Sequence, residues 1–336
     1  MSKDSDFHHI PVLFAECMEA LAIRKNGVYL DGTAGGGGHS AGILERLGRG
    51  GQLLSLDRDE MALEAAGKKL RSCKTEASFD LIHSTFSQVD KVLEERNIEG
   101  LDGVLLDLGV SSAQLDIAER GFSYMKEGAL DMRMNQAKGE TAAEWLAHVS
   151  EDTLAFVLRA YGEERYAGRI AHAICREREI TAITQTTQLA ELICRTMPPS
   201  SRREKQHPAK RSFQAIRIAV NHELDELETF LEKIPFLMNP LGRIAVISFH
   251  SLEDRRVKTK MREWEKGCIC PSDLPLCCCG RSSLGKAIDR KGLVAGPEEC
   301  AGNPRSRSAR LRVFERNAQA ADPAVWKAET TQLMRE

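Results

Sequence analysis

Apolar runs that each end in a carboxylate recur along the first third of the chain. These runs span residues 28–31, 52–57 and 101–107, and they end in Asp31, Asp57 and Asp107. Segments whose apolar residues recur at helical spacing lie between them, and a further apolar run at 79–83 fits a strand. Strand and helix in alternation predict a parallel, doubly wound α/β sheet. Such a sheet binds ligands at the carboxyl ends of its strands, where these carboxylates fall.

Helical spacing replaces this alternation from about residue 114 to residue 197. The helices expected there span 141–149, 153–161, 163–178 and 187–197. A long helix at 212–234 and an apolar strand at 243–249 then restore the α/β pattern. The predicted parts are a first core segment (1–113), a helical insert for substrate recognition (114–210), a second core segment with a Cys-rich loop at 267–280 (211–320), and a tail (321–336).

Four consecutive glycines, Gly35 to Gly38, follow the first strand and precede a helix that begins near His39. Glycine adopts backbone angles closed to other residues and lets the backbone approach a ligand closely. The helix start adds N–H donors and a positive dipole end. Asp57, which ends the next strand, can accept hydrogen bonds from a ribose diol. The stretch predicts a nucleoside-cofactor site.

The glycine spacing alone leaves the cofactor open. Gly36, Gly38 and Ala41 also match the dinucleotide pattern G-x-G-x-x-A, and a purely structural turn is a further alternative. Asp31 favours S-adenosylmethionine, because a carboxylate attracts the cationic amino-acid portion of that cofactor and repels a pyrophosphate.

Composition bounds the class of protein. The chain has 336 residues, 42% hydrophobic and 29% charged, with a net charge of −2, as expected of a globular protein. No apolar run approaches the roughly twenty residues that span a bilayer, and the N-terminus lacks a signal-peptide core, so we expect a cytoplasmic protein without membrane contact. The near-neutral charge means that any nucleic-acid contact comes from local basic clusters.

The ten cysteines argue against a disulfide framework in this compartment. Half of them gather in one short loop: Cys268, Cys270, Cys277, Cys278 and Cys279. Two C-x-C pairs could supply four thiolates to zinc, although C-x-x-C is the usual spacing. Reduced thiols in a proline-rich loop are the alternative, and the sequence leaves the metal unknown.

The main basic cluster lies between residues 202 and 217, with His207 and Phe213 interleaved. The residues predicted to bind RNA are Arg202, Arg203, Lys205, Lys210 and Arg211. A solvated surface patch is the alternative. A second basic patch contains Arg305, Arg307, Arg310 and Arg312.

Seven motifs occur in order along the chain: D-G-T-A-G-G-G-G-H-S, D-L-G-V-S-S-A-Q-L-D, R-G-F-S-Y, L-D-M-R-M, Y-G-E-E-R, H-P-A-K-R-S-F-Q-A-I-R-I and I-S-F-H-S-L-E-D-R. With them the chain resembles, from about residue 9 to 316, the bacterial small-subunit ribosomal RNA (cytosine-N4)-methyltransferases. The resemblance implies a Rossmann-like class I fold with an all-helical insert, S-adenosylmethionine as cofactor, and the exocyclic N4 of a cytidine in the decoding region of 16S rRNA as target. The cofactor contacts it implies are Gly37, Gly38, His39, Asp57, Phe86, Asp107 and Gln114. It implies no metal.

Methylating the cytosine amine requires a hydrogen-bond acceptor beside its N–H, because the lone pair is delocalised into the ring. Asp107 and His250, which follow two strands, are the predicted catalytic residues. Asp107 could instead hold the cofactor ammonium, and His250 could instead merely cap the loop. The helix after His250 is expected to begin with Ser251 as cap and Asp254 as third residue. The alternatives from other classes are a nicotinamide oxidoreductase and a non-catalytic RNA-binding assembly factor. The sequence leaves open whether the substrate is naked RNA or the small ribosomal subunit. It also leaves open whether the protein forms a homodimer.

Overall fold

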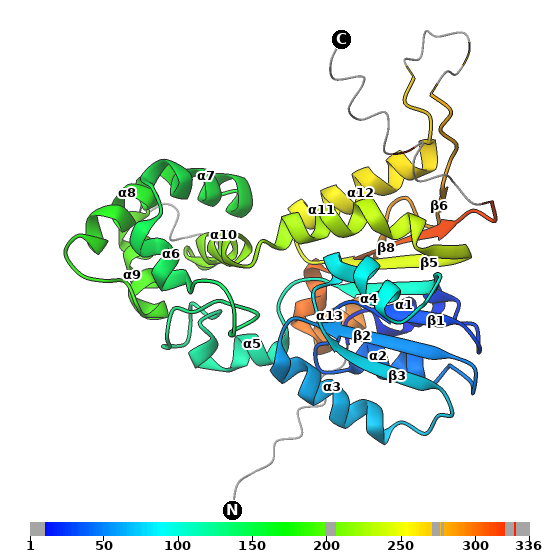
Figure 1. The fold of residues 1–336 in the computed structure, drawn as a ribbon. Helices are drawn as coiled ribbons and strands as arrows, with labels where there is room; N and C mark the ends of the chain where they lie inside the picture. Colours follow the sequence, from blue (N-terminus) through cyan, green and yellow to red (C-terminus); the bar gives the residue numbers. More distant parts are fainter. Residues whose placement is uncertain (1–10, 199–205, 271–275, 277–278, 320–325, 327–336) are drawn as a thin grey trace, which may run out of the picture. The chain divides into compact units, whose positions relative to one another are not determined.

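The computed structural model describes residues 11–198, 206–270, 276, 279–319 and 326. The chain divides into two compact units, each treated by itself (Figure 1). Residues 1–109 and 226–336 form an α/β unit, and Val110–Asp225 forms a helical unit.

One mixed sheet organises the α/β unit. Its described strands are β1 (Val28–Asp31), β2 (Gln52–Asp57), β3 (Ser78–His83), β4 (Leu101–Asp107), β5 (Met238–Ser248), β6 (Gly285–Ala287), β7 (Leu293–Val294) and β8 (Arg310–Arg316). They follow the order β3-β2-β1-β4-β5-β8-β6, with β7 paired to β8. The first five are parallel, whereas β8 is antiparallel to β5 and β6. The order 3-2-1-4-5 is that of the Rossmann fold, which confirms the predicted fold class.

Helices cover both faces of this sheet. One face packs on helices α1 (Phe14–Leu21), α2 (Gly38–Leu44) and α3 (Glu60–Ser72), and the other on α4 (Val89–Glu95), α11 (Glu223–Lys233) and α12 (Ser251–Lys266). Neighbouring strand residues alternate between the two cores, as Leu53 and Leu54 do in β2. Parallel strands covered on both faces are apolar throughout. This explains why the strands stood out as continuous apolar runs. A short helix, α13 (Pro297–Gly302), precedes β8.

The helical unit has a hydrophobic core of its own. Its described helices are α5 (Ser112–Asp116), α6 (Ala142–His148), α7 (Glu151–Gly162), α8 (Ala167–Arg178), α9 (Thr186–Thr196) and α10 (Lys210–Asn221). Helix α10 buries Phe213, Ala215 and Ile216 in that core. The unit therefore extends past the boundary expected at residue 210, because the apolar side of α10 is part of its core.

Three sequence-based element boundaries were wrong by four residues or more. The helix expected over 163–178 begins at Ala167, because Glu163 adopts a left-handed backbone conformation (φ +50°) that ends α7. The helix expected over 212–234 is two helices, because His222 adopts a left-handed backbone conformation (φ +51°) that ends α10. Apolar spacing continues on both sides of this break and so conceals it. Strand β5 begins at Met238 and not at residue 243, since its first residues extend the pairing with β4 across a register irregularity. No helix in the described part of the chain is both long and apolar enough to cross a bilayer.

Candidate cofactor and catalytic site

The glycine turn joins β1 to α2 at the carboxyl end of the sheet. Gly37 has φ +77°, and a Cβ there would lie 2.8 Å from the Cα of Ala66 in α3. At Gly38 a Cβ would lie 2.3 Å from Cγ of Pro11. The fold itself thus requires both glycines. At Gly36 a Cβ would meet no atom within 4 Å, so the open side of the turn is at this residue.

Asp57 ties the glycine turn to the end of β2. Its Oδ2 accepts a hydrogen bond from the N–H of Gly35 (2.8 Å), and its Oδ1 accepts one from the N–H of Asp59 (2.9 Å). Burial raises the pKa of Asp57, and these two bonds oppose the rise. A carboxylate offers about four acceptor positions. The bonds to the chain use two, so Asp57 retains capacity for two ribose hydroxyls.

Asp31, at the end of β1, is fully buried. Its carboxylate accepts hydrogen bonds from Oγ of Ser40 (2.6 Å) and from the N–H of Thr33 (3.1 Å). Burial raises its pKa to about 6, although both bonds oppose the shift. With its side chain enclosed in this way, Asp31 can influence a cation at this edge only through its charge.

Asp107 ends β4, next to β1 in the sheet. Strand order reverses between these two strands, and this is where doubly wound sheets bind ligands. Its Oδ1 is buried and has no hydrogen-bond partner among the described residues, and its Oδ2 lies 3.7 Å from Nε2 of His39. Burial, and then the charges of Asp31 and Glu253, raise the pKa of Asp107 to about 8. A buried acceptor in a negative environment suits an ammonium or amine donor.

Two predicted cofactor contacts are held by aromatic neighbours. The ring of His39, in α2, stacks on Phe14 with 5.9 Å between centroids. Phe86 follows β3 and packs edge-to-face on Phe230 at 5.6 Å. Both side chains are more than nine-tenths buried. Either ring can therefore offer a ligand only a small part of its surface, at positions fixed by the fold.

His250 is the N-cap residue of α12. Its Nε2 lies 3.1 Å from Oε1 of Glu253, whose other oxygen accepts the N–H of Phe249 at 2.9 Å. The cap expected at Ser251 with Asp254 is therefore wrong by one residue. Asp254 is instead paired with Arg312, 2.6 Å from carboxylate oxygen to Nε.

Glu253 is the functional candidate that sequence reasoning missed. Its spacing of three residues from His250 was the available signal, because a helix cap and its third helical residue are brought together by capping-box geometry. Because the capping box was expected one residue later, at Ser251 and Asp254, the pairing of His250 with Glu253 was missed.

Gln114 belongs to the helical unit. Its side-chain oxygen accepts the N–H of Ser111 at 3.0 Å, while its own N–H donates to Oγ of Ser111 at 3.2 Å, which makes a capping box at the start of α5. The side chain is buried. Its contact with the cofactor stays a prediction.

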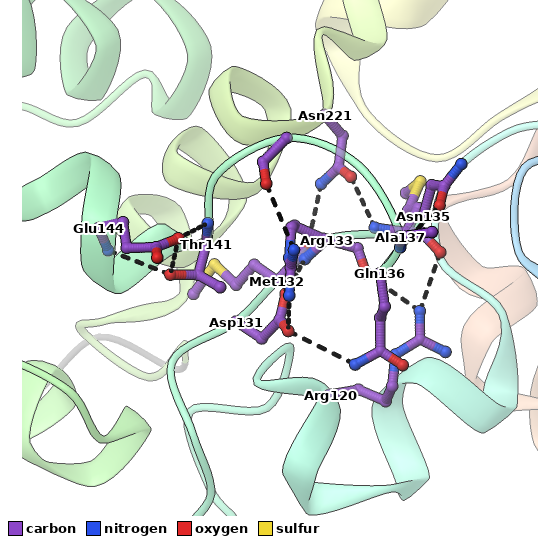
Figure 2. A network of polar contacts seen from close by, with 12 residues as sticks. Arg120, Asp131, Met132, Arg133, Asn135, Gln136, Ala137, Thr141, Glu144 and Asn221 are labelled. Atoms are coloured by element: carbon purple, nitrogen blue, oxygen red, sulfur yellow. Dashed lines mark hydrogen bonds and ion pairs between the residues drawn. The ribbon is translucent and has the colours of Figure 1, made fainter.

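Two motifs of the resemblance, R-G-F-S-Y and L-D-M-R-M, form one polar network in the helical unit (Figure 2). The guanidinium of Arg120 donates to the carbonyl oxygens of Arg133 and Met134, each at 3.0 Å. Asn221 of α10 accepts the N–H of Met134 and donates to the carbonyl of Met132, both at 2.7 Å. The network fixes a loop in which Met132 has a positive φ of +60°.

The predicted RNA-binding residues are only partly described. Arg202, Arg203 and Lys205 lie outside the described residues. Lys210 and Arg211, in the first turn of α10, are exposed and half-buried respectively and form no ion pair with a described residue.

Other cations of the two basic clusters are neutralised within the fold. The Nε of Arg217 lies 2.7 Å from Glu223. Arg312, of the second basic patch, is buried against Asp254. Arg217 and Arg312 therefore stabilise the fold. Counting them among the surface cations overstated the positive charge of the two clusters.

Comparison with known proteins identifies the family. The model of the MraW methylase family matches residues 6–317. The chain belongs to this family.

Curated relatives of this family member match over nearly their whole length. A protein of Heliobacterium modesticaldum named ribosomal RNA small subunit methyltransferase H is 49% identical, over 92% of this chain and 99% of that protein. One of the same name from Symbiobacterium thermophilum is 50% identical, over 91% and 96%. A crystal structure of a putative rRNA methylase from Clostridium thermocellum aligns with 93% of this chain and 99% of its own, with a TM-score of 0.42 and 10% identity.

Proposed function

We propose that this MraW family member transfers the methyl group of S-adenosylmethionine to the exocyclic N4 of a cytidine in the decoding region of 16S rRNA. The observation that carries the proposal is the buried, unpartnered Oδ1 of Asp107 at the point where the strand order reverses. The names of the curated relatives, which are ribosomal RNA small subunit methyltransferases, support the substrate class.

The acidic strand ends suit this cofactor. Asp31, Asp57 and Asp107 lie at the carboxyl ends of three adjacent strands. Their combined field favours a ligand with net positive charge and disfavours the pyrophosphate of a dinucleotide. Asp57 would hold the ribose hydroxyls, and the open side of the turn at Gly36 would let the ligand come close to the backbone. When bound, S-adenosylmethionine supplies an electrophilic methyl group.

Asp107 and His250 would serve the cytosine amine. Oδ1 of Asp107 would accept one N4–H bond, which localises the nitrogen lone pair for in-line attack. Nε2 of His250 lies 3.1 Å from Glu253, and the imidazole would accept the departing proton. Glu253 would orient the imidazole, as a carboxylate does for a general-base histidine.

The RNA would be held through its phosphates. Lys210 and Arg211 are cations without an ion pair among the described residues, and Arg202, Arg203 and Lys205 adjoin them in sequence. We propose the small ribosomal subunit in the cytoplasm as the setting of the reaction. A homodimer stays a prediction that sedimentation equilibrium would check.

The test is transfer of labelled methyl from S-adenosylmethionine to small subunits and to naked 16S rRNA that both lack the modification, followed by nucleoside analysis. We expect label in N4-methylcytidine, and none with the Asp107→Asn variant. Label in another nucleoside, or no transfer to either substrate while cofactor binding is intact, would contradict the proposal. The two substrates compared side by side distinguish free RNA from the subunit.

A further inference from the structure

The Cys-rich loop leaves the end of α12 and returns at β6. Its two stems are fixed to each other. The N–H of Leu284 donates to the carbonyl of Trp264 at 2.8 Å. Gly267 passes so close to the returning stem that a Cβ there would lie 2.5 Å from the backbone of Ser282. The fold therefore brings the first and last cysteines of the loop together, although eleven residues separate them in sequence.

Three sulfur atoms meet at the base of this loop. The Sγ atoms of Cys268, Cys270 and Cys279 all lie within 4.8 Å of one another. Sγ of Cys268 lies 3.7 Å from Sγ of Cys279. Zn–S bonds of about 2.3 Å in a tetrahedral site place two sulfurs about 3.8 Å apart. A disulfide would require about 2.05 Å. The observed separation therefore matches two ligands of one tetrahedral ion.

We propose that Cys268, Cys270 and Cys279 bind one zinc ion through their thiolates. Thiolates select soft and borderline cations over magnesium or calcium. Each thiol loses its proton to the solvent as its Zn–S bond forms. Cys277 and Cys278 lie outside the described residues. The three sulfurs that the structure describes supply three positions of a tetrahedral ion.

The ion would have a structural role. Helix α12 runs from Ser251 to Lys266, and sixteen residues at 1.5 Å each separate its ends by about 24 Å. His250 is at one end and the sulfur cluster at the other. The described part of the loop has little apolar burial to stabilise it, since Leu276 is 80% exposed. A metal would join the two ends of the loop to each other beyond the point where Trp264 and Leu284 pack in the core.

The first experiment compares metal content of the full chain purified under reducing conditions. We expect about one zinc per chain after incubation with zinc and removal of excess by a weak chelator. The variant Cys268→Ser/Cys270→Ser/Cys279→Ser should retain none. The control variant Cys73→Ser/Cys175→Ser/Cys194→Ser, which removes as many thiols elsewhere, should keep the zinc. Equal zinc content in both variants would overturn the proposal.

Two further measurements guard against a variant that fails to fold. Cofactor affinity should be unchanged in the cluster variant, because the sulfurs are remote from the strand ends. The wild-type chain loaded with cobalt should show thiolate-to-cobalt charge-transfer absorbance and a tetrahedral visible spectrum. A wild-type chain that binds neither metal, or that carries a Cys268–Cys279 disulfide after reducing purification, would overturn the site regardless of any variant.

Discussion

Asp131 in the helical unit and Asp107 in the α/β unit show two opposite environments for an acidic side chain. In the helical unit Asp131 is paired with Arg133, whose Nε and Nη2 lie 2.8 and 2.9 Å from its oxygens, and the pairing lowers the pKa of Asp131 against the effect of burial. In the α/β unit Asp107 has no such guanidinium among the described residues, and its pKa is raised to about 8.

This difference distinguishes a carboxylate that stabilises the fold from one that is a candidate for binding a ligand. A paired carboxylate such as Asp131 satisfies its own fold and has little left for a ligand. A polar atom that is buried without a hydrogen-bond partner, as Oδ1 of Asp107 is, costs the free protein stability. Asp107 is therefore best explained by a donor that arrives with a ligand.

The largest effect should follow Asp57→Ala, which removes the proposed ribose acceptor. Two hydrogen bonds to a charged acceptor contribute about 3–6 kcal/mol, so cofactor affinity should fall more than roughly 100-fold. Calorimetric titration measures this, with circular dichroism to verify folding. Asp80→Ala, on the neighbouring strand β3, is the matched control and should bind normally. Retained affinity in Asp57→Ala would place the ribose elsewhere.

Asn221→Ala should break the helical unit's network without touching the cofactor site. It removes bonds to three backbone groups, two of them buried, and we expect a loss of about 2–4 kcal/mol in unfolding free energy. Gln214→Ala, on the same helix with one bond to the carbonyl of Tyr161, should lose about 1 kcal/mol or less. Urea titration distinguishes them. If the Asn221→Ala chain folds but has impaired cofactor affinity, the claim that this network serves only the stability of the helical unit is wrong.

The raised pKa of Asp107 predicts pH dependence of two kinds. In the free chain the folded state holds this proton up to about pH 8 whereas the unfolded state releases it near pH 4, so stability should fall as pH rises between these values. Affinity for the cationic cofactor should rise over the upper part of that range, roughly tenfold or more from pH 6 to 8, as the carboxylate ionises.

Asp107→Asn provides the control, because the cofactor's own titration is common to both chains. Its affinity should change less with pH, and its stability should fall less from pH 5 to 8. Parallel pH profiles for the two chains would show that another group titrates.

The smallest effect concerns the surface of α10. Lys210→Ala/Arg211→Ala should weaken RNA binding and reduce the slope of log affinity against log salt by about 0.7–0.9 for each phosphate that the variant no longer neutralises. Arg169→Ala/Arg176→Ala removes the same charge from α8 and should leave the slope unchanged. Equal slopes for all three chains would make the α10 cations ordinary surface.

The central strands β1, β2, β4 and β5 were predictable because they are buried on both faces. Continuous apolar runs such as 101–107 identified the strands, and the carboxylates that end three of them indicated the edge at which we propose the site. The helical unit was located because helical spacing of apolar residues replaces the alternation of strand and helix. Its end was misplaced because the left-handed turn at His222 leaves no trace in apolar spacing.

The roles of single charges were harder to predict. Arg217 and Arg312 looked like parts of basic patches, yet each has an acidic partner. Glu223 is close in sequence, but Asp254 is 58 residues from Arg312. The Glu253–His250 contact needed only local geometry, and it was missed because the helix start was set one residue too late.

The chain order of the strands has a consequence during biosynthesis. Strand β4 pairs with β5, yet about 130 residues of helical unit and connecting chain are translated between Asp107 and Met238. At bacterial elongation rates of about 5–20 residues per second, β4 emerges roughly 7–26 seconds before its partner. During that interval the nascent sheet has an open, apolar edge, a template for pairing with other chains. Folding of the central helices before β5 appears would shorten the effective loop to be closed, so the insert's independent core would also serve the assembly of the sheet on either side of it.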